Sequence, residues 1–329
     1  MLTKAPMIKN LTCISLPTPF PVGPVNVYLA LGDPLTLIDT DPKTEAARDA
    51  LTTALHMHGC RVENLKQIIL THHHVDHVGL TAELVARSGA QVYTHAFNLP
   101  WLANHQARRE RHAPFYRALF RENGVPEKIA NEIDLLSAAF ERWTEPFADA
   151  RVLHEGHQLN FGDATWQVYH TPGHAGGLIC LWEKHSRTLL ANDHILKDIS
   201  SNAIIEPPEH AHAPRPRRLL EYIHEVERMA QLQPALILPG HGEAFGEVES
   251  LVRERVSFHQ QRAQIIHVYL AAGPLTLWQI SRALFPELRN GVDHFLGLSE
   301  TLGHLDLLEK ERRVRVIRAG ELLRWEQVG

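Results

Sequence analysis

Four metal-binding side chains stand within six positions of this chain of 329 residues, which contains 23 histidines in all. They are His72, His74, Asp76 and His77, in the run from Thr71 to His77. Imidazole and carboxylate groups are ligands for zinc, iron and manganese, and the run contains no cysteine, which argues against a closed structural zinc site. The spacing therefore predicts an open metal site that supports chemistry on a substrate.

The segments around this run indicate how it is positioned. It directly follows Leu65–Leu70, a short apolar stretch that we expect to be a buried strand. A helical pattern at 79–88 and a second strand at 91–94 come next, and strand, helix, strand at this spacing predicts an α/β fold. Open α/β sheets place their sites at the carboxyl ends of strands, so we expect the run to form a loop at such an end.

The pattern Thr-His-x-His-x-Asp-His resembles the signature of the metallo-β-lactamase superfamily. Four further landmarks of that family are present in order, each at the end of an expected strand: Asp39 in LIDTD, His174 in TPGH, Asp193 in LLANDHIL and His241 in LPGHG. The resemblance covers about residues 10–250. It implies an α/β fold of the αββα sandwich type.

The resemblance also implies two divalent metal ions, with zinc the first choice and iron or manganese also suited to the ligands. Asp193 would bridge the two ions. The first would be held by His72, His74 and His174, and the second by Asp76, His77 and His241. Asp76 is in addition the expected catalytic residue, because it would orient a metal-bridging hydroxide.

Three other residues are expected to support the ligands without binding metal. Asp39 stands where the family has a structural aspartate, and His170 and His194 lie close to ligands in the sequence. The chain departs from the family pattern at Asn192, where glycine is common, and at His73, where an aromatic residue is more common. Neither is a ligand position, so we expect the ligand set to be complete.

A two-metal site predicts metal-assisted hydrolysis. The whole chain is similar to a glyoxalase II-like or lactamase-like subgroup, which implies a small-molecule substrate, namely a thioester or related acyl compound, as in hydroxyacylglutathione hydrolases. RNA phosphodiester cleavage, lactone hydrolysis and β-lactam hydrolysis use the same site and stay open as alternatives. A non-enzymatic, metal-binding transcription regulator is a hypothesis from a different class.

The sequence predicts a catalytic domain over residues 1–250 with a helical insertion at about 97–147, and a smaller domain over 251–329. The smaller domain has three expected helices followed by a hairpin, the order of a winged helix. Its candidate recognition helix, Val292–Glu309, is acidic and has no lysine or arginine, whereas a nucleic-acid reader needs a basic surface. We therefore expect packing or dimerisation, with a homo-oligomer left open, and no nucleic-acid partner.

The arginines of the insertion suit either an anionic substrate tail or a solvated helix pair: Arg108, Arg109, Arg111, Arg117 and Arg121.

Composition gives further expectations about where the chain works. The net charge is −5, which favours neither nucleic acid nor an anionic membrane. No stretch of 18 apolar residues is present, and the first twenty residues lack the apolar core of a signal peptide. Cys13, Cys60 and Cys180 lie far apart, and we expect them to be buried thiols in a reducing compartment. These features predict a cytoplasmic protein without a membrane partner.

Overall fold

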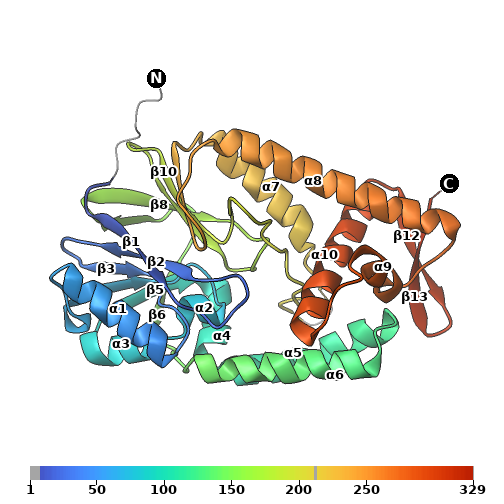
Figure 1. Cartoon of the computed structure of the whole chain (residues 1–329), viewed down its shortest axis with the longest axis horizontal. Coiled ribbons are helices and arrows are strands. Elements are labelled where there is room, and N and C mark those ends of the chain that lie inside the picture. Colours follow the sequence, from blue (N-terminus) through green and yellow to red (C-terminus); the bar gives the residue numbers. More distant parts are fainter. Residues whose placement is uncertain (1–7, 211–212, 329) are drawn as a thin grey trace.

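Two β-sheets face each other in this computed structural model, which describes residues 8–210 and 213–328 (Figure 1). The first sheet has six strands in chain order: β1 (Leu11–Leu16), β2 (Val25–Ala30), β3 (Thr36–Ile38), β4 (Gln67–Ile69), β5 (Gln91–His95) and β6 (Ala150–Leu153). The second has five strands in the order β11-β10-β9-β8-β7: β7 (Gln158–Phe161), β8 (Ala164–His170), β9 (Ile179–Glu183), β10 (Thr188–Asn192) and β11 (Leu236–Pro239).

Helices cover the outer face of each sheet. One apolar cluster, with Tyr28 and Trp166 at its centre, fills the space between the sheets. A second cluster joins the first sheet to α1 (Glu45–Met57) and α3 (Thr81–Ser88), and a third joins the second sheet to α7 (Arg218–Gln231) and α8 (Val248–Tyr269). Strands covered on both faces are buried throughout and largely apolar, as β2, β9 and β10 are. This is the expected αββα arrangement.

The metal-binding run lies at the end of β4, but it is not a loop throughout. Residues 71–74 are irregular, and α2 (Val75–Val78) begins immediately after them. The expectation of a loop is therefore wrong for Asp76 and His77, which lie in this short helix. A turn of helix places both side chains on the inner side, since His77 is completely buried.

The insertion is helical, as expected. Its elements are η2 (Ala96–Asn98), α4 (Leu99–Ala103), α5 (His105–Glu122), α6 (Glu127–Ala139) and η3 (Phe140–Trp143), whereas η1 (Val62–Asn64) lies outside it, between α1 and β4. After α8, the chain continues through η4 (Leu270–Ala272), α9 (Leu277–Leu284), α10 (Gly291–Lys310), β12 (Val314–Ala319) and β13 (Leu322–Gln327). The expected helices and hairpin are all present, whereas a winged-helix domain stays a prediction.

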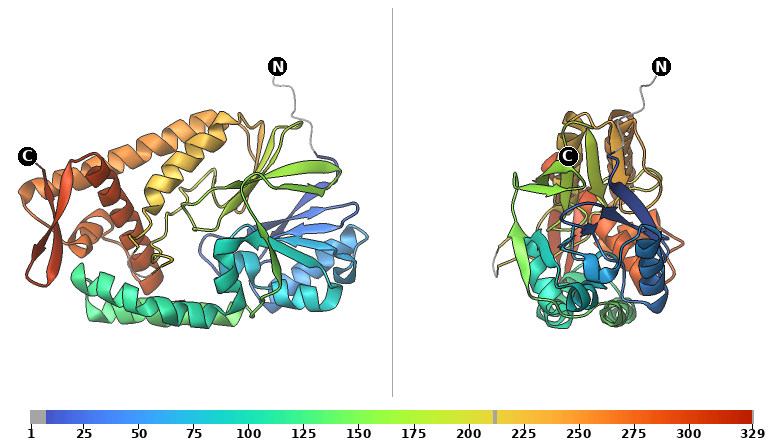
Figure 2. Two further views of the ribbon diagram at one scale, coloured as in Figure 1. Left: turned by 180° about the vertical axis from the view of Figure 1, so that it is seen from behind. Right: turned by 90° about the vertical axis from the view of Figure 1, so that its left-hand side faces the viewer.

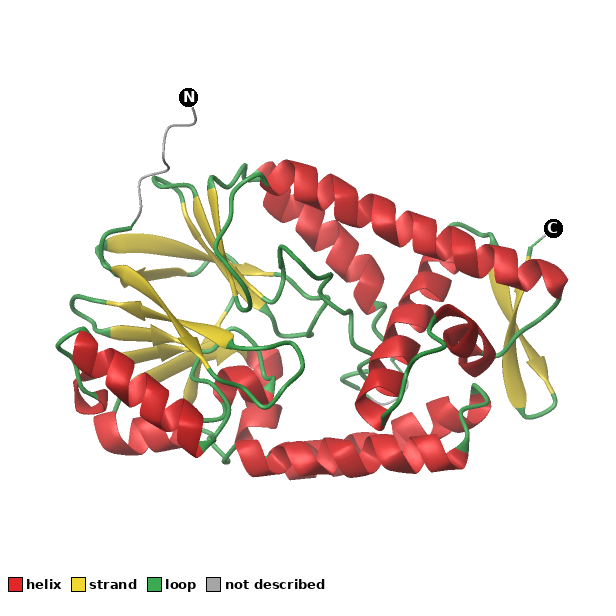
Figure 3. Cartoon of the chain, viewed as in Figure 1, coloured by secondary structure: helices red, strands yellow, loops and turns green. Residues whose placement is uncertain are grey.

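The insertion and the C-terminal helices share one apolar cluster. Phe120 of α5 and Ile133 of α6 pack with Leu298 and Leu302 of α10. Figures 2 and 3 show α5 and α6 running beneath the C-terminal helices, while α8 extends from the sheets to the hairpin. Two segments far apart in sequence therefore form one helical region beside the sheets.

Two other expectations meet the structure here. Cys180 is buried, but Cys13 is exposed, so the expectation of three buried thiols is wrong. Cys13 lies on the edge strand β1, where burial alternates between Ile14 and the residues on either side of it. Among the described residues, no helix has the length and apolar character needed to cross a membrane. Residues 1–7 of the segment examined for a signal peptide lie outside the described part.

Candidate metal centre

Five strand ends meet at one edge of the two sheets, and each carries a landmark of the sequence. Asp39 follows β3 and the metal-binding run follows β4 in the first sheet. His174, Asp193 and His241 follow β8, β10 and β11 in the second. All seven predicted ligands are thereby brought together.

The first group of ligands comprises three histidines. The Nδ1 atom of His74 lies 3.0 Å from Nε2 of His72 and 2.9 Å from Nε2 of His174. Oδ2 of Asp193 lies 3.6 Å from Nε2 of His174 and 3.9 Å from Nε2 of His72. Three ring nitrogens and one carboxylate oxygen thus converge on one point, as the sequence predicts.

The second group lies on the other side of the same carboxylate. Oδ2 of Asp193 is 3.4 Å from Nε2 of His77 and 3.6 Å from Nε2 of His241. Oδ2 of Asp76 is 3.6 Å from Nε2 of His241 and 3.8 Å from Nε2 of His77. One oxygen of Asp193 therefore faces both groups, which is the position of a bridging ligand.

Hydrogen bonds on the outer side hold three of the rings. Nδ1 of His174 donates to the carbonyl of Asn202 at 2.9 Å, and Nδ1 of His241 donates to the carbonyl of Pro24 at 2.8 Å. Nδ1 of His77 donates to Asp39 at 3.0 Å. A proton on Nδ1 leaves the lone pair on Nε2, inside the cluster, where a metal would take it.

Asp39 ties the two sheets together behind the ligands. Its carboxylate accepts from the amide and the hydroxyl of Thr71, each at 2.8 Å, and also from the side chain of Asn192. Asn192 has a positive φ of 47°, a conformation that glycine and asparagine tolerate. The departure from glycine thus keeps the backbone conformation and adds a hydrogen bond to the structural aspartate.

The electrostatics of the cluster fit divalent cations. Burial alone would raise the pKa of Asp193, but His77 and His241 outweigh it and hold that pKa well below its usual range. Burial opposes the same attraction at His241, whose pKa the carboxylate of Asp193 raises to about 10. Burial and neighbouring imidazoles lower the pKa of His72 and His74. The pKa shifts therefore keep His72 and His74 neutral, while the carboxylate of Asp193 draws positive charge onto His77 and His241, the place where a metal ion would supply it.

Two atoms of the cluster also indicate the need for a positively charged partner. Nε2 of His77 and Oδ1 of Asp193 are buried without a hydrogen-bond partner among the described residues. Buried polar atoms nearly always have a partner, and a bound metal ion would supply one here. The residues present therefore fit the metal ions that the sequence predicts.

The predicted supporting histidines lie farther out. Nε2 of His170 lies 2.8 Å from the carbonyl of Gly176, and its ring stacks on His95. His194 is completely buried against Tyr222, and burial lowers its pKa to about 3. Within the described residues neither makes a hydrogen bond to a predicted ligand, so their supporting role stays a prediction.

Three further charged side chains lie near the cluster, and no pattern in the sequence points to them. Glu206 and Arg218 form a buried ion pair, and Glu206 also accepts from the amide of Gly176. Asp41 is completely buried at a positive φ of 76°, where burial and the charge of Asp76 raise its pKa to about 9. Only tertiary contacts reveal these groups, because no spacing relates them to the ligands.

His73 behaves as the aromatic residue that the family has more often at its position. Its ring lies parallel to that of Trp101, with the centroids 4.7 Å apart. The side chain points away from the ligands of its own run and lies on the wall of a cavity. The departure at this position therefore preserves ring stacking.

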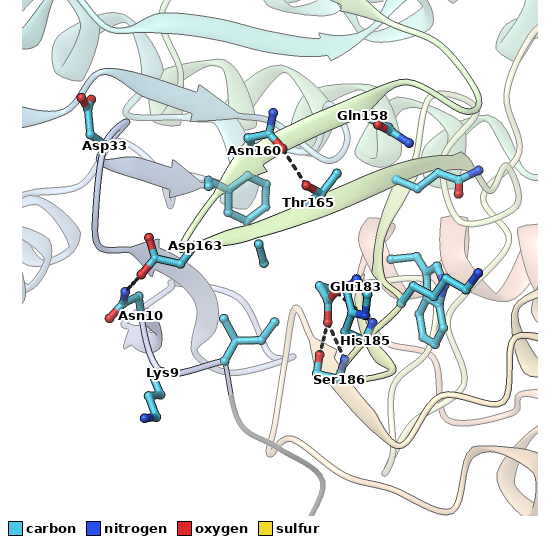
Figure 4. Close-up of a pocket in the computed structure, with 17 residues that line it drawn as sticks. Lys9, Asn10, Asp33, Gln158, Asn160, Asp163, Thr165, Glu183, His185 and Ser186 are labelled. Carbon is cyan, nitrogen blue, oxygen red and sulfur yellow. Dashed lines mark hydrogen bonds between the residues drawn. The ribbon is translucent and has the colours of Figure 1, made fainter.

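That cavity has a volume of about 470 Å³ and adjoins the metal cluster. Its lining includes His73, His74 and Asp76 on one side and residues of the insertion and α10 on the other. A larger cavity of about 920 Å³ lies around the β7–β8 turn (Figure 4). There the hydroxyl of Thr165 donates a hydrogen bond to the side chain of Asn160, and the side-chain amide of Asn10 donates one to Asp163. Since no predicted ligand lines the larger cavity, the smaller one is the candidate substrate site.

Comparison with known proteins agrees with this geometry. The model of the family described as "Metallo-beta-lactamase superfamily" matches residues 20–241, which include all seven predicted ligands. The chain belongs to the metallo-beta-lactamase superfamily. It is 35% identical over 306 residues to a protein of Bacillus subtilis (strain 168) named "Probable metallo-hydrolase YqjP", covering 93% of this chain and 94% of that protein. The chain is thus a metal-dependent hydrolase.

Two solved structures extend the similarity to nearly the whole chain. The metallo-beta-lactamase family protein TTHA1429 of Thermus thermophilus matches with a TM-score of 0.81 and 29% identity, over 97% of this chain and 99% of that one. A beta-lactamase domain protein of Burkholderia ambifaria matches with a TM-score of 0.83 and 21% identity, over 97% and 92% of the two chains. The second match shows the shared fold alone. Both include the helical region beyond residue 241, so this region is part of a recurring arrangement.

Proposed function

We propose that this superfamily member hydrolyses a thioester of a small acyl group, using two divalent metal ions of which zinc is the first choice. The observation that carries this proposal is the position of the 470 Å³ cavity, which adjoins His74 and Asp76 of the ligand cluster. A substrate held in that cavity has its reacting carbonyl beside the two ligand groups. Lactones and β-lactams carry a similar carbonyl and enter the test below as competitors.

Different side chains of the site would have different roles in such a reaction. When bound, the metal ions would supply an activated water and polarise the substrate carbonyl. Asp193 faces both ligand groups, so it fixes their separation. Asp76 keeps some exposure toward the cavity, with 14% of its side chain accessible, and so can orient the attacking group as predicted from the sequence. A thiolate, whose conjugate acid has an ordinary pKa of about 8.5, leaves without a strong proton donor.

The surroundings of the cavity support a small acyl substrate over RNA. The cavity is lined largely by aromatic and aliphatic side chains, including Phe20, Trp101 and Phe295. RNA-binding grooves need basic and accessible surfaces. The candidate recognition helix α10 is buried from Gly297 to Leu308, which leaves that stretch no face for a nucleic-acid groove.

A panel of one thioester, one lactone, one β-lactam and one structured RNA tests the proposal. The metal-loaded protein should hydrolyse the thioester with the highest kcat/KM, and a chelator should abolish the reaction. Cleavage of RNA without thioester hydrolysis would overturn the proposal. Asp193→Ala should lose this hydrolysis, and full activity in that variant would mean that the reaction does not depend on the proposed metal centre.

A further inference from the structure

The cavity beside the metal cluster is closed on its far side by two segments that the sequence separates by more than 150 residues. Tyr116 and Phe120 of α5 and Ile133 of α6 form one part of the wall. Val292, Phe295 and Leu296 of α10 form the other. Much of the wall opposite the metal ligands is therefore apolar, and part of it comes from the C-terminal helices.

Four charged residues of these helices also line the cavity, namely Arg109, Arg117, Asp134 and Asp293. Arg109 donates to Asp134 at 3.0 Å and to Glu141 at 2.6 Å, so its charge is balanced. Arg117 also lines the cavity, but it is exposed to solvent. Arg108 is buried beneath Trp101, with its guanidinium 5.8 Å from the ring centroid. The sequence left anion binding and a solvated helix pair open for these arginines, and Arg109, which lines the cavity, is already paired with two carboxylates.

The polar groups nearest the predicted ligands also line the cavity. His74 and Asp76 belong to the ligand cluster, and Glu206 is paired with Arg218 beside it. A ligand that fits must have one polar, reactive end at the metal ligands and an apolar body toward α10. A volume of about 470 Å³ lies within the range of about 300–1,000 Å³ typical of small-molecule sites.

We infer that the cavity binds the acyl group of the substrate as an extended or branched hydrocarbon chain, and that α10 sets the length it accepts. This inference rests on the proposed function, because it names which part of a thioester occupies the cavity. It also gives the C-terminal helices a role in the site that differs from the packing or dimerisation expected from the sequence. Leu296 and Phe295 are the residues that would meet the end of the chain.

A series of thioesters tests the inference directly. Acyl derivatives of N-acetylcysteamine from acetyl to decanoyl share one neutral thiol and differ only in the hydrocarbon chain. Each methylene transferred from water into an apolar site should raise kcat/KM about fourfold, until the cavity is full. A flat dependence on chain length would overturn the inference.

A substitution at the far wall shows whether α10 sets the limit. Leu296→Trp should shorten the preferred chain by several carbons, so that kcat/KM falls more for the decanoyl thioester than for the acetyl thioester. Leu135→Trp is the matched control, since Leu135 lies on α6 with 71% of its surface exposed and does not line the cavity. Equal effects of the two substitutions would count against the assignment.

A binding measurement separates this inference from the proposed function. Titration calorimetry should show decanoate binding at least tenfold more tightly than butyrate, and Leu296→Trp should remove the difference. If no thioester is hydrolysed but this preference is observed, the thioester proposal is wrong and the apolar-chain site stands. If thioesters are hydrolysed without any preference in rate or binding, the proposed function stands and the inference is wrong.

Discussion

Among the described residues, buried histidines gather with potential metal ligands at two places, and each place has at least three such ligands within 4.8 Å of one another. One is the cluster around Asp193. The other consists of His259 on α8 with Glu300 and His304 on α10. Composition and burial do not separate the two groups, but their hydrogen bonds and charges do.

At the C-terminal group the nitrogen atoms already have partners. Nδ1 of His304 donates to the carbonyl of Glu300 at 2.6 Å, and Nδ1 of His259 lies 3.1 Å from Nε2 of His304. One proton between the two rings satisfies both. Nε2 of His259 lies 3.5 Å from the hydroxyl of Ser200, so each ring nitrogen of the pair has a partner. Arg262 donates to Glu300 at 2.7 Å, so the carboxylate is balanced by a cation of the chain itself.

Around Asp193 the situation is the reverse. The outer nitrogens are occupied by carbonyls and by Asp39, the inner nitrogens face one another, and Asp193 and Asp76 lie among imidazoles without an arginine or lysine partner among the described residues. The difference teaches that a metal site needs inward lone pairs and uncompensated carboxylates, and that close histidines alone do not make one.

Removing the carboxylate of Asp193 should show the largest difference between the two histidine groups. Asp193→Ala should lose bound metal and reduce kcat/KM by at least about 10³-fold, because both ligand groups lose a common oxygen. Elemental analysis and thioester assays check this. Glu300→Gln is the matched change at the other group and should leave metal content and kcat/KM within about twofold. Full activity of Asp193→Ala would contradict the assignment of the bridging ligand.

A smaller effect should follow from crowding the same carboxylate. A Cβ atom at Gly240 would lie 2.0 Å from Oδ1 of Asp193, so Gly240→Ala must displace that side chain. Metal affinity should fall by about 10- to 100-fold while the protein stays folded. Gly246→Ala is the control, since its added methyl meets only the carbonyl of Ala235 at 3.3 Å. Unchanged metal affinity in Gly240→Ala would show that the carboxylate is not a ligand.

The buried pair of His259 and His304 should make the free energy of unfolding depend on pH. Burial lowers the pKa of His259 to about 3, and burial likewise lowers that of His304, with Arg262 acting in the same direction on both. The unfolded chain, with a histidine pKa of about 6.5, therefore binds more protons below that pH. Stability from these groups is present above about pH 6.5 and is lost as the pH falls toward about 3.

Urea unfolding of metal-loaded protein at about pH 6.5 and about pH 5 measures this loss. Because folded His259 stays neutral, this residue alone should lower the free energy of unfolding by about 2 kcal/mol between those two pH values. In a double variant, His259→Leu with His304→Leu, the difference between the two pH values should shrink accordingly. Replacing both partners avoids leaving one buried nitrogen unpaired. An unchanged pH dependence would mean that the pair is protonated in the folded protein.

The contrast also explains what the sequence could predict. His72, His74, Asp76 and His77 are neighbours in the chain, and their strand fixes where they point, so local spacing was enough to find them. The other ligands follow strands in the same way. His259 and His304 are 45 positions apart and meet only because α8 packs on α10, so no spacing pointed to them.

The far wall of the cavity escaped prediction for the same reason. Leu296 reaches the site only because α10 packs on α6 of the insertion, and the sequence showed α10 only as an acidic helix of a separate domain. The expectation that Cys13 is buried was wrong for a related reason. Its exposure depends on β1 being an edge strand, which the pattern of residues does not reveal. Local spacing was enough to find the first four ligands and the family resemblance supplied the other three, but neither located the walls of the cavity.

Metal content per chain tests the central claim most directly. Elemental analysis should find two metal ions in the unchanged protein and two in the double variant His259→Leu with His304→Leu, but a loss of metal in Asp193→Ala. That result places both ions at the cluster around Asp193. Loss of an ion from the double variant, or two ions retained in Asp193→Ala, would contradict the account.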